Sequence, residues 1–358
     1  MNKTQAQHIA IQTLKELIRI PSVSGNEGGA ADCIQRVLEN QGFSVSRKNH
    51  NVWSVLHRSD KLPTLLLNSH TDTVPPGVGW TTDPFYPLEE GDKISGLGSN
   101  DAGASLVSLM AVFILLSQEK KLPFNIIFIA SAEEEISGKK GIESILTKIG
   151  PVDLGIVGEP TGMKMAVAEK GLLVLDCTAH GTTGHAARDK GKNAIYLAMD
   201  DIGWIRNYRF NKKSKITGEV MMQVTQIDGG IKHNIIPGQC SFVVDVRTND
   251  QYTNDEVLKV LKQNLSSTVA ARSTRLNASG IAPGHPIVEA ARQLNIECAG
   301  SDTLSDQALM PFPTVKMGPG SSDRSHTTDE FIEKQEIISG IDTYLKLLNK
   351  YAELINHN

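Results

Sequence analysis

Segments that are apolar on both faces limit most strongly what this chain of 358 residues can fold into. Thr64–Asn68, Phe124–Ser131 and Val152–Val157 are typical of buried strands, and Val52–Leu56 is a fourth strand candidate. Helical patterns separate these segments along the chain. Strands of this kind occur in sheets that helices cover on both faces. We therefore predict an α/β fold with a central sheet flanked by helices.

The helices expected around this sheet come from apolar residues at helical spacing. They cover residues 4–18, Ala30–Glu39, Leu106–Leu116 and Ile287–Leu294, and a long terminal helix is expected from Glu330. The most apolar of them, Leu106–Leu116, is far shorter than the roughly 20 residues that cross a membrane. We therefore expect it to be a core helix.

The pattern changes near Glu169. From there, three segments alternate as half-exposed strands do: Gly171–Ala179, Glu219–Gln226 and Cys240–Arg247. Helices are expected at Ala194–Asn207 and Asp255–Leu265, and a last strand at Thr268–Leu276. This order is typical of a small α+β sandwich, and about 100–200 residues per domain favours two domains. We predict one discontinuous domain, 1–169 and 281–358, and an inserted two-layer domain, 170–280.

The charge balance argues against two classes of partner. The net charge is −4, from 36 basic and 40 acidic residues, with no long run of one sign. Nucleic acids and membrane surfaces attract a concentrated basic face, so we expect neither as a partner. Four cysteines lie far apart without a C-x-x-C pair, which indicates a reducing compartment. The first residues lack the apolar core of a signal peptide, so we expect a soluble, cytoplasmic protein.

Polar side chains follow the buried segments at the point where each one ends. Thr64–Asn68 runs into His70 and Asp72, which project to the same side of an extended chain because they are two residues apart. Phe124–Ser131 runs into Glu133-Glu134-Glu135, and Val152–Val157 into Glu159. Open α/β sheets place their sites beyond the carboxyl ends of strands. Taken singly, each of these groups is more often part of a solvated turn.

Two further candidates lie in glycine-rich loops. Asp101 stands in Gly96-Leu-Gly-Ser-Asn-Asp101-Ala-Gly103, where its charge would repel a phosphate group; its alternative role is to cap a helix starting near Ala102. His326 precedes the last helix, and a lone histidine is more often structural than a ligand.

The conjunction of these groups favours a metal centre. We expect four of the five to lie at strand ends, and the fold to bring His326 to them. Two histidines with several carboxylates suit two zinc ions, with cobalt or manganese as substitutes. The charges balance for two divalent ions: +4 against −3 from Asp101 and two glutamates and −1 from a bridging hydroxide. Adjacent carboxylates at a buried strand end also need neighbouring cations.

The same stretches carry a family resemblance. The motifs are S-H-T-D-T-V-P, G-L-G-S-N-D-A-G, A-E-E-E, G-E-P-T, G-H-A-A-R and G-P-G-S-S-D-R-S-H-T-T-D-E, in this order between residues 69 and 330. The chain resembles the dinuclear-zinc amidohydrolases and peptidases that include acetylornithine deacetylase and succinyl-diaminopimelate desuccinylase. The resemblance implies a catalytic domain with a mixed central sheet, and an inserted lid and dimerisation domain.

The resemblance also implies roles for the metal-site residues. His70 and Glu159 would bind one zinc, His326 and Glu135 the other, and Asp101 would bridge them through a loop with a cis Asp101–Ala102 peptide bond. Asp72 would orient a histidine ring.

The general base is Glu134 in this reading. The family pattern is an acid followed by Glu-Glu, in which the first glutamate of the pair is the base and the second is a ligand. Because the preceding acid is here itself a glutamate, a shift by one residue to Glu133 as base and Glu134 as ligand stays open.

In the inserted domain, the resemblance implies three residues that meet the substrate. His185 would come from the partner subunit of a homodimer and stabilise an oxyanion, Asn234 would hold the substrate, and Arg247 would pair with a carboxylate. The alternatives are a surface histidine, a turn asparagine and an edge-strand salt bridge.

The activity implied is metal-dependent hydrolysis of the amide bond of an N-acetyl- or N-succinyl-amino acid. Ornithine, citrulline or lysine would be released, as in arginine biosynthesis. The alternatives are succinyl-diaminopimelate desuccinylase and a di- or tripeptidase. A non-catalytic metal-binding relative is an alternative of another class.

Overall fold

The largest sheet has nine strands, and seven of them form the centre of the part of the chain that contains both termini. The computed structural model describes residues 1–188 and 190–356. The strands are β1 (Val45–Lys48), β2 (Asn51–Leu56), β3 (Thr64–His70), β6 (Asn125–Ser131), β7 (Leu154–Val157), β8 (Met165–Glu169) and β17 (Thr314–Lys316). Their order is β1-β2-β6-β3-β7-β17-β8, with parallel pairing from β6 to β17 and antiparallel pairing between the other neighbours. Strands β15 (Ser279–Gly280) and β16 (Cys298–Ser301) pair with β8 and complete the nine. The predicted mixed α/β sheet is confirmed.

Alternate residues of β3 show why its sequence is apolar throughout. Leu65 and Leu67 belong to the core cluster under α3, whereas Leu66 belongs to a second cluster with Ile142 and Ile145. All three leucines are at most 1% exposed. Both faces of the sheet are therefore covered, as the apolar segments predict.

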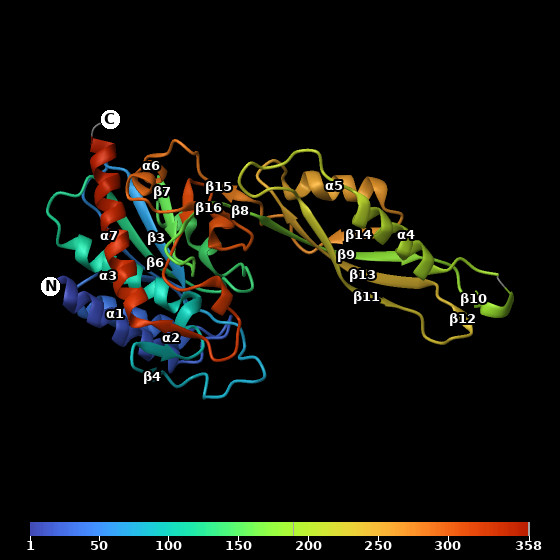
Figure 1. The fold of residues 1–358 in the computed structure, drawn as a ribbon, viewed down its shortest axis with the longest axis horizontal. Coiled ribbons are helices and arrows are strands. Elements are labelled where there is room, and N and C mark those ends of the chain that lie inside the picture. The colour runs from blue at the N-terminus through green and yellow to red at the C-terminus, as the bar shows by residue number, and fades with distance from the viewer. Residues whose placement is uncertain (189, 357–358) are drawn as a thin grey trace. The chain divides into compact units, whose positions relative to one another are not determined.

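The helices of this unit pack mainly on one face of the sheet. They are α1 (Lys3–Ile18), α2 (Gly28–Asn40), α3 (Ala104–Ser117), α6 (Pro286–Gln293) and α7 (Lys334–Asn356). Helix α3 contacts β3, β6, α1 and α7, so its whole circumference is apolar (Figure 1). Residues Ser99–Ser117 form the one helical span in the described residues that is long and apolar enough to cross a membrane, and 83% of the span is buried inside the protein.

The terminal helix begins later than predicted. Residues Phe331–Glu333 form strand β18 instead of the first helical turn, because they pair with β5 (Lys93–Ser95), which in turn pairs with β4 (Leu88–Glu90). Helix α7 therefore starts at Lys334 and not at Glu330. The partner strand lies far away in sequence, so the local pattern cannot reveal it.

The second unit has a sheet of its own. Its strands are β9 (Gly171–His180), β11 (Met221–Gly229), β13 (Gln239–Thr248) and β14 (Thr268–Ala271), all antiparallel, in the order β11-β13-β9-β14. Helices α4 (Ala194–Asn207) and α5 (Asn254–Asn264) share one apolar core with the sheet. The two-layer α+β arrangement and its element order are as predicted, although β14 ends five residues before the expected Leu276.

The two units divide the chain as follows. The first comprises Met1–Val167, Ile281–Ala299 and Ser305–Asn358, and the second Ala168–Gly280 and Gly300–Leu304. The predicted crossings at 169/170 and 280/281 lie within two residues of these limits. The return of Gly300–Leu304 to the second unit was not predicted.

The remaining short elements are β10 (Gly184–His185), β12 (Ile235–Ile236), η1 (Ser99–Gly103), η2 (Ile142–Ser144), η3 (Leu146–Lys148), η4 (Ala186–Arg188), η5 (Asp306–Leu309) and η6 (Ser322–Arg324).

Candidate metal centre

Three neighbouring parallel strands deliver acids and a histidine to one edge of the first unit's sheet. His70 is the last residue of β3, the Glu133–Glu135 turn follows β6, and Glu159 follows β7 by two residues. The register places His70 opposite Ser131, the last residue of β6. Because β6, β3 and β7 are adjacent and parallel, their carboxyl ends meet at the same edge.

Asp101 reaches this edge by a different route from the one predicted. It follows no strand of the central sheet but lies in the irregular turn η1, which leads into α3. Its backbone angles are not helical, and helix α3 starts only at Ala104, so Asp101 does not cap that helix. The Asp101–Ala102 peptide bond is cis, as the resemblance implies. The turn points the carboxylate between two histidines: Oδ1 lies 3.4 Å from His70 Nε2, and Oδ2 lies 3.6 Å from His326 Nε2.

The side chains form two groups of three that share Asp101. His70, Asp101 and Glu159 have ligand atoms within 4.8 Å of one another, and so do Asp101, Glu135 and His326. Within the second group, His326 Nε2 lies 2.9 Å from Glu135 Oε2. These are the sets that the resemblance assigns to two ions; that they bind metal stays a prediction.

The carboxylates of this edge lack enough positive charge. Glu159 Oε1 is buried and has no hydrogen-bond partner. Burial, together with the charges of Asp101 and Glu135, raises the pKa of Glu159 to about 8, although His70 opposes the shift. Burial and the charge of Glu159 likewise raise the pKa of Glu134 well above its ordinary value. Bound cations would relieve this repulsion, so the donor set fits them.

The surrounding carboxylates also raise the pKa values of the two histidines. Burial lowers the pKa of His70, but hydrogen bonds to Asp101 and Asp72 outweigh it, and its pKa lies well above the ordinary value. The hydrogen bond to Glu135 raises the pKa of His326 to about 9. A cation in either group would therefore displace a proton.

Asp72 connects the ends of β3 and β6. His70 Nδ1 lies 2.9 Å from the backbone oxygen of Asp72 and 3.5 Å from its Oδ1. The carboxylate of Asp72 also accepts the backbone N–H groups of Glu134 and Glu135 and the hydroxyl of Ser24. Asp72 therefore orients the His70 ring and the glutamate turn together.

The three glutamates of the turn differ in direction. Glu133 has a φ of +55°, and its Oε2 accepts the backbone N–H of Lys140 at 3.0 Å. Glu135 points to His326. Glu134 lies near the charges of Glu159, His70 and Glu135. Of the two readings of the base, the Glu134/Glu135 pair therefore agrees better with the geometry.

Three buried acidic residues, to which the sequence analysis gave no role, form hydrogen bonds with the segments around the centre. Glu27 accepts the backbone N–H of Glu133, and Asp306 accepts the Ser131 hydroxyl at 2.6 Å. Glu330 accepts three backbone N–H groups of the loop that carries Asp101. Each is at most 3% exposed. Nothing in their local sequence distinguishes them from surface acids, apart from the position of Glu330 at the end of a family-like motif.

In the second unit, the structure brings two of the three predicted substrate residues together. His185, in β10, pairs with Ile235, in β12, and the N–H of Ala186 donates to the backbone oxygen of Asn234 at 3.1 Å. Both side chains are exposed. Arg247 lies near the other end of β13, where it forms two hydrogen bonds with Asp245, of 2.8 and 3.1 Å. The salt-bridge alternative thus describes the observed contact of Arg247.

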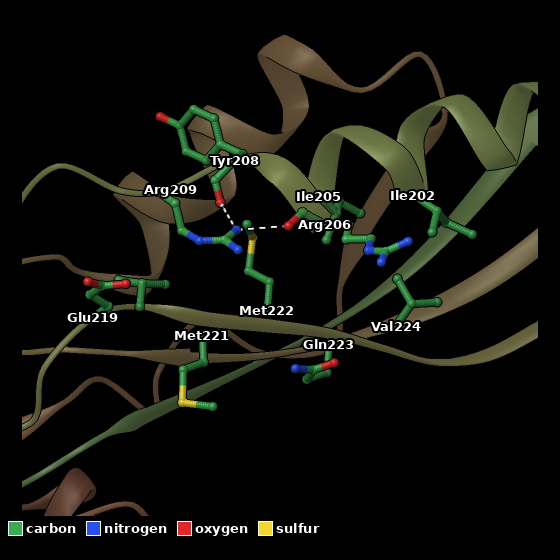
Figure 2. A pocket seen from close by; sticks show the side chains of 11 residues that line it. Ile202, Ile205, Arg206, Tyr208, Arg209, Glu219, Met221, Met222, Gln223 and Val224 are labelled. Atoms are coloured by element: carbon green, nitrogen blue, oxygen red, sulfur yellow. Dashed lines mark hydrogen bonds between the residues drawn. The ribbon is translucent and has the colours of Figure 1, made fainter.

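A groove of about 500 Å³ in the second unit holds none of the predicted residues. It lies between α4 and the edge strand β11, and Figure 2 shows Arg206, Tyr208, Met222 and Val224 in its walls. Arg209 donates to the backbone oxygens of Arg206 and Tyr208 there. The groove therefore offers no cluster of acids and histidines comparable to the candidate centre.

The sheet edge and its neighbouring loops bring together two histidines and several carboxylates, a donor set that fits a metal-dependent hydrolase. The sequence model of Peptidase family M20/M25/M40 matches residues 66–350, and the chain belongs to this family. The expected enzyme class, a metal-dependent hydrolase, is thereby confirmed.

The relatives differ in their substrates. The chain is 26% identical to a succinyl-diaminopimelate desuccinylase from Cereibacter sphaeroides, over 85% of this chain and 84% of that protein. It is 28% identical to an acetylornithine deacetylase from Edwardsiella ictaluri, over 99% and 100%. A dinuclear metal-binding peptidase of the M20 family from Bacillus subtilis has the same fold, with a TM-score of 0.73, 16% identity and coverage of 96% and 98%.

Proposed function

We propose that the protein hydrolyses the amide bond of an N-acetyl- or N-succinyl-amino acid and releases ornithine, citrulline or lysine. The observation that carries this proposal is the pair of three-residue groups sharing Asp101, with Glu134 beside them. The names of the relatives at 26 and 28% identity support acyl-amino acids as substrates. Arginine biosynthesis and a cytoplasmic location remain part of this proposal.

We further infer two divalent cations per chain, zinc first and cobalt or manganese as substitutes. The fit rests on the buried oxygen of Glu159 that has no hydrogen-bond partner, and on the raised pKa of Glu159. The dinuclear peptidase of the same fold supports the number. When bound, such ions supply Lewis acidity and lower the pKa of a water molecule toward neutrality.

The chain's own residues then move the proton. Glu134 accepts it from the attacking water and passes it to the departing amine, and the raised pKa suits a group that must do both. Asp72 holds the backbone of Glu134 and the ring of His70 in place during these transfers. His185 would donate a hydrogen bond to the oxyanion, and Arg247 would bind the substrate carboxylate after releasing Asp245.

The second unit supports a homodimer with shared sites. Gln239 and Arg247 are eight residues apart on β13, a span of roughly 26 Å at 3.3 Å per residue. Strand β12 and its neighbours His185 and Asn234 lie beyond the Gln239 end (Figure 1). The distance along β13 between Arg247 and the end near His185 is much longer than an N-acyl amino acid. If His185 and Arg247 both meet one substrate, they therefore belong to two different subunits.

The exposed surface of the second unit is compatible with such a dimer. Strand β11 is an edge strand with Met221 and Ile227 exposed, and α4 exposes Tyr196 and Met199. Apolar side chains and an unpaired strand edge together favour association with a second copy.

The test is a substrate panel. The zinc-loaded protein is incubated with N-acetyl- and N-succinyl-ornithine, -citrulline, -lysine and -diaminopimelate, and with di- and tripeptides, and freed amine is measured. We expect kcat/KM of about 10⁴ M⁻¹s⁻¹ or more for one acyl-ornithine, -citrulline or -lysine, and loss of turnover with chelator. Turnover of succinyl-diaminopimelate or of peptides alone would favour the alternatives, and a zinc-free protein would contradict the site.

A further inference from the structure

Glu330 is a buried carboxylate with an unusual set of partners. It is 2% exposed. Its Oε1 accepts the backbone N–H groups of Asn100 and Asp101 at 2.8 and 2.9 Å, and its Oε2 accepts that of Gly98 at 3.0 Å. One side chain therefore fixes the backbone of the loop that carries Asp101.

Glu330 also belongs to the loop that carries His326. Glu330 follows His326 by four residues, and its backbone oxygen accepts the N–H of Gly96 at 2.9 Å. A second connection lies nearby: the Asn100 side chain accepts the N–H of Ser321 at 2.9 Å and donates to the Ser321 oxygen at 3.0 Å. The loops of Asp101 and His326 are thus joined by both Glu330 and Asn100.

The two groups of candidate ligands depend on this connection to different degrees. In the group formed by Asp101, Glu135 and His326, two of the three candidate ligands lie on the loops that Glu330 joins. In His70, Asp101 and Glu159, only Asp101 does. The His326 side chain is also 54% exposed, whereas that of His70 is 1% exposed. The group that contains His326 therefore has the least other support.

We propose that Glu330 is a positioning residue that sets the affinity of the Asp101–Glu135–His326 group for its cation. The inference rests on the proposed two-cation centre. In this role the oxygens of Glu330 bind backbone N–H groups, and so hold the backbone on which the carboxylate of Asp101 stands. Partners of ligands that act in this way change metal affinity by about 10- to 100-fold when they are removed.

The experiment uses the full chain and the variant Glu330→Gln. The amide oxygen can keep the bonds from Asn100 and Asp101, but the NH₂ group then faces the N–H of Gly98, so one of three bonds is lost and two donors oppose each other. Glu333→Gln is the matched control, since Glu333 is exposed and lies three residues further along the chain, at the end of β18. The two zinc dissociation constants are measured by competition with a chromophoric chelator, along with the melting temperature of the metal-free protein.

We expect Glu330→Gln to weaken the binding of one zinc ion by about tenfold or more and the binding of the other by less than about threefold. Glu333→Gln should leave both unchanged. If the binding of both ions weakens equally and the melting temperature falls, the role of Glu330 is merely structural. Unchanged dissociation constants would overturn the inference outright. If Glu330→Gln does not fold, Asn100→Ala, which removes the second connection, is expected to weaken the same single ion. A wild-type chain that binds no second zinc would instead overturn the two-cation centre itself.

Discussion

Asp72 accepts the backbone N–H of Glu134 at 3.0 Å, so the carboxylate that follows β3 holds the residue proposed as general base after β6. Its other oxygen accepts the N–H of Glu135 at 3.1 Å and the Ser24 hydroxyl at 2.6 Å. Burial raises the pKa of Asp72, but His70 above all, and then Ser24 and the N–H of Glu134, outweigh this effect and keep the pKa below its ordinary value. Asp72 therefore holds the turn of three glutamates through the backbone of two of its residues.

Replacing Glu134 tests the base directly. We expect Glu134→Ala to lower kcat by about 10²- to 10⁴-fold, because a positioned general base contributes that much. Zinc affinity should change little, since Glu134 belongs to neither three-residue group. Steady-state kinetics and chelator competition on the same sample measure both quantities.

The control for this variant is its neighbour. Glu133→Gln should retain kcat within about tenfold, because the Glu133 carboxylate accepts the N–H of Lys140 and an amide oxygen can replace it. A large loss in Glu133→Gln together with normal turnover in Glu134→Ala would move the base to Glu133.

Mixing two inactive variants tests whether His185 acts across a dimer. One partner carries His185→Ala and the other Glu134→Gln. If His185 acts in trans, each mixed dimer has one complete site, so random exchange should restore about one quarter of wild-type activity. The activity is followed after the two proteins are mixed and allowed to exchange subunits. Activity that stays at the level of the separate variants, once exchange is shown by native mass spectrometry, would place His185 in its own subunit's site or outside catalysis.

The metal-free protein should lose stability as the pH rises from 6 to 9. The folded-state pKa values of His326 and Glu159, about 9 and about 8, lie above the ordinary values of 6.5 and 4.5. Each group therefore binds its proton more tightly when folded; its stabilisation is complete below its unfolded pKa and is lost as the pH rises through its folded pKa. We expect the melting temperature in chelator to fall by a few degrees over this range.

Two comparisons separate this effect from general alkaline destabilisation. Glu159→Gln cannot titrate, so its melting temperature should depend less steeply on pH. Added zinc should reverse the trend, because metal affinity increases as the ligands lose their protons. A melting temperature that rises with pH in chelator would contradict the prediction.

Gly103 is expected to be indispensable for the loop of Asp101. A Cβ atom at this position would lie 2.3 Å from the backbone oxygen of Gly98 and 2.7 Å from Leu14 Cδ1. Gly103→Ala should therefore displace η1, cost about 1–3 kcal/mol of stability and weaken zinc binding. Gly77→Ala is the control, since nothing lies within 4 Å of a Cβ there. Denaturant unfolding and zinc titration measure both effects, and equal behaviour of the two variants would contradict the argument.

Local sequence predicted most elements well, because burial on one or both faces leaves a pattern within each segment. Helix α4 has the predicted limits, and β3 and β6 begin or end within two residues of them. The errors fall where a distant partner decides the structure. Residues 331–333 pair with β5 and form a strand in place of a helical turn, and Asp101 stands in a turn and not at a strand end.

Local patterns in the sequence predicted the sheet covered on both faces, the two-layer second unit and the residue types near the strand ends, since hydrophobic periodicity and short motifs encode these within each segment. Long-range packing, by contrast, places His70 and His326 at opposite oxygens of Asp101 and buries Glu330 and Glu27 as supports. It also decided that Arg247 contacts Asp245 and stands far along β13 from Asn234. The physical reason is that these relations join residues tens to hundreds of positions apart. The direction of each side chain there depends on packing that no single segment contains.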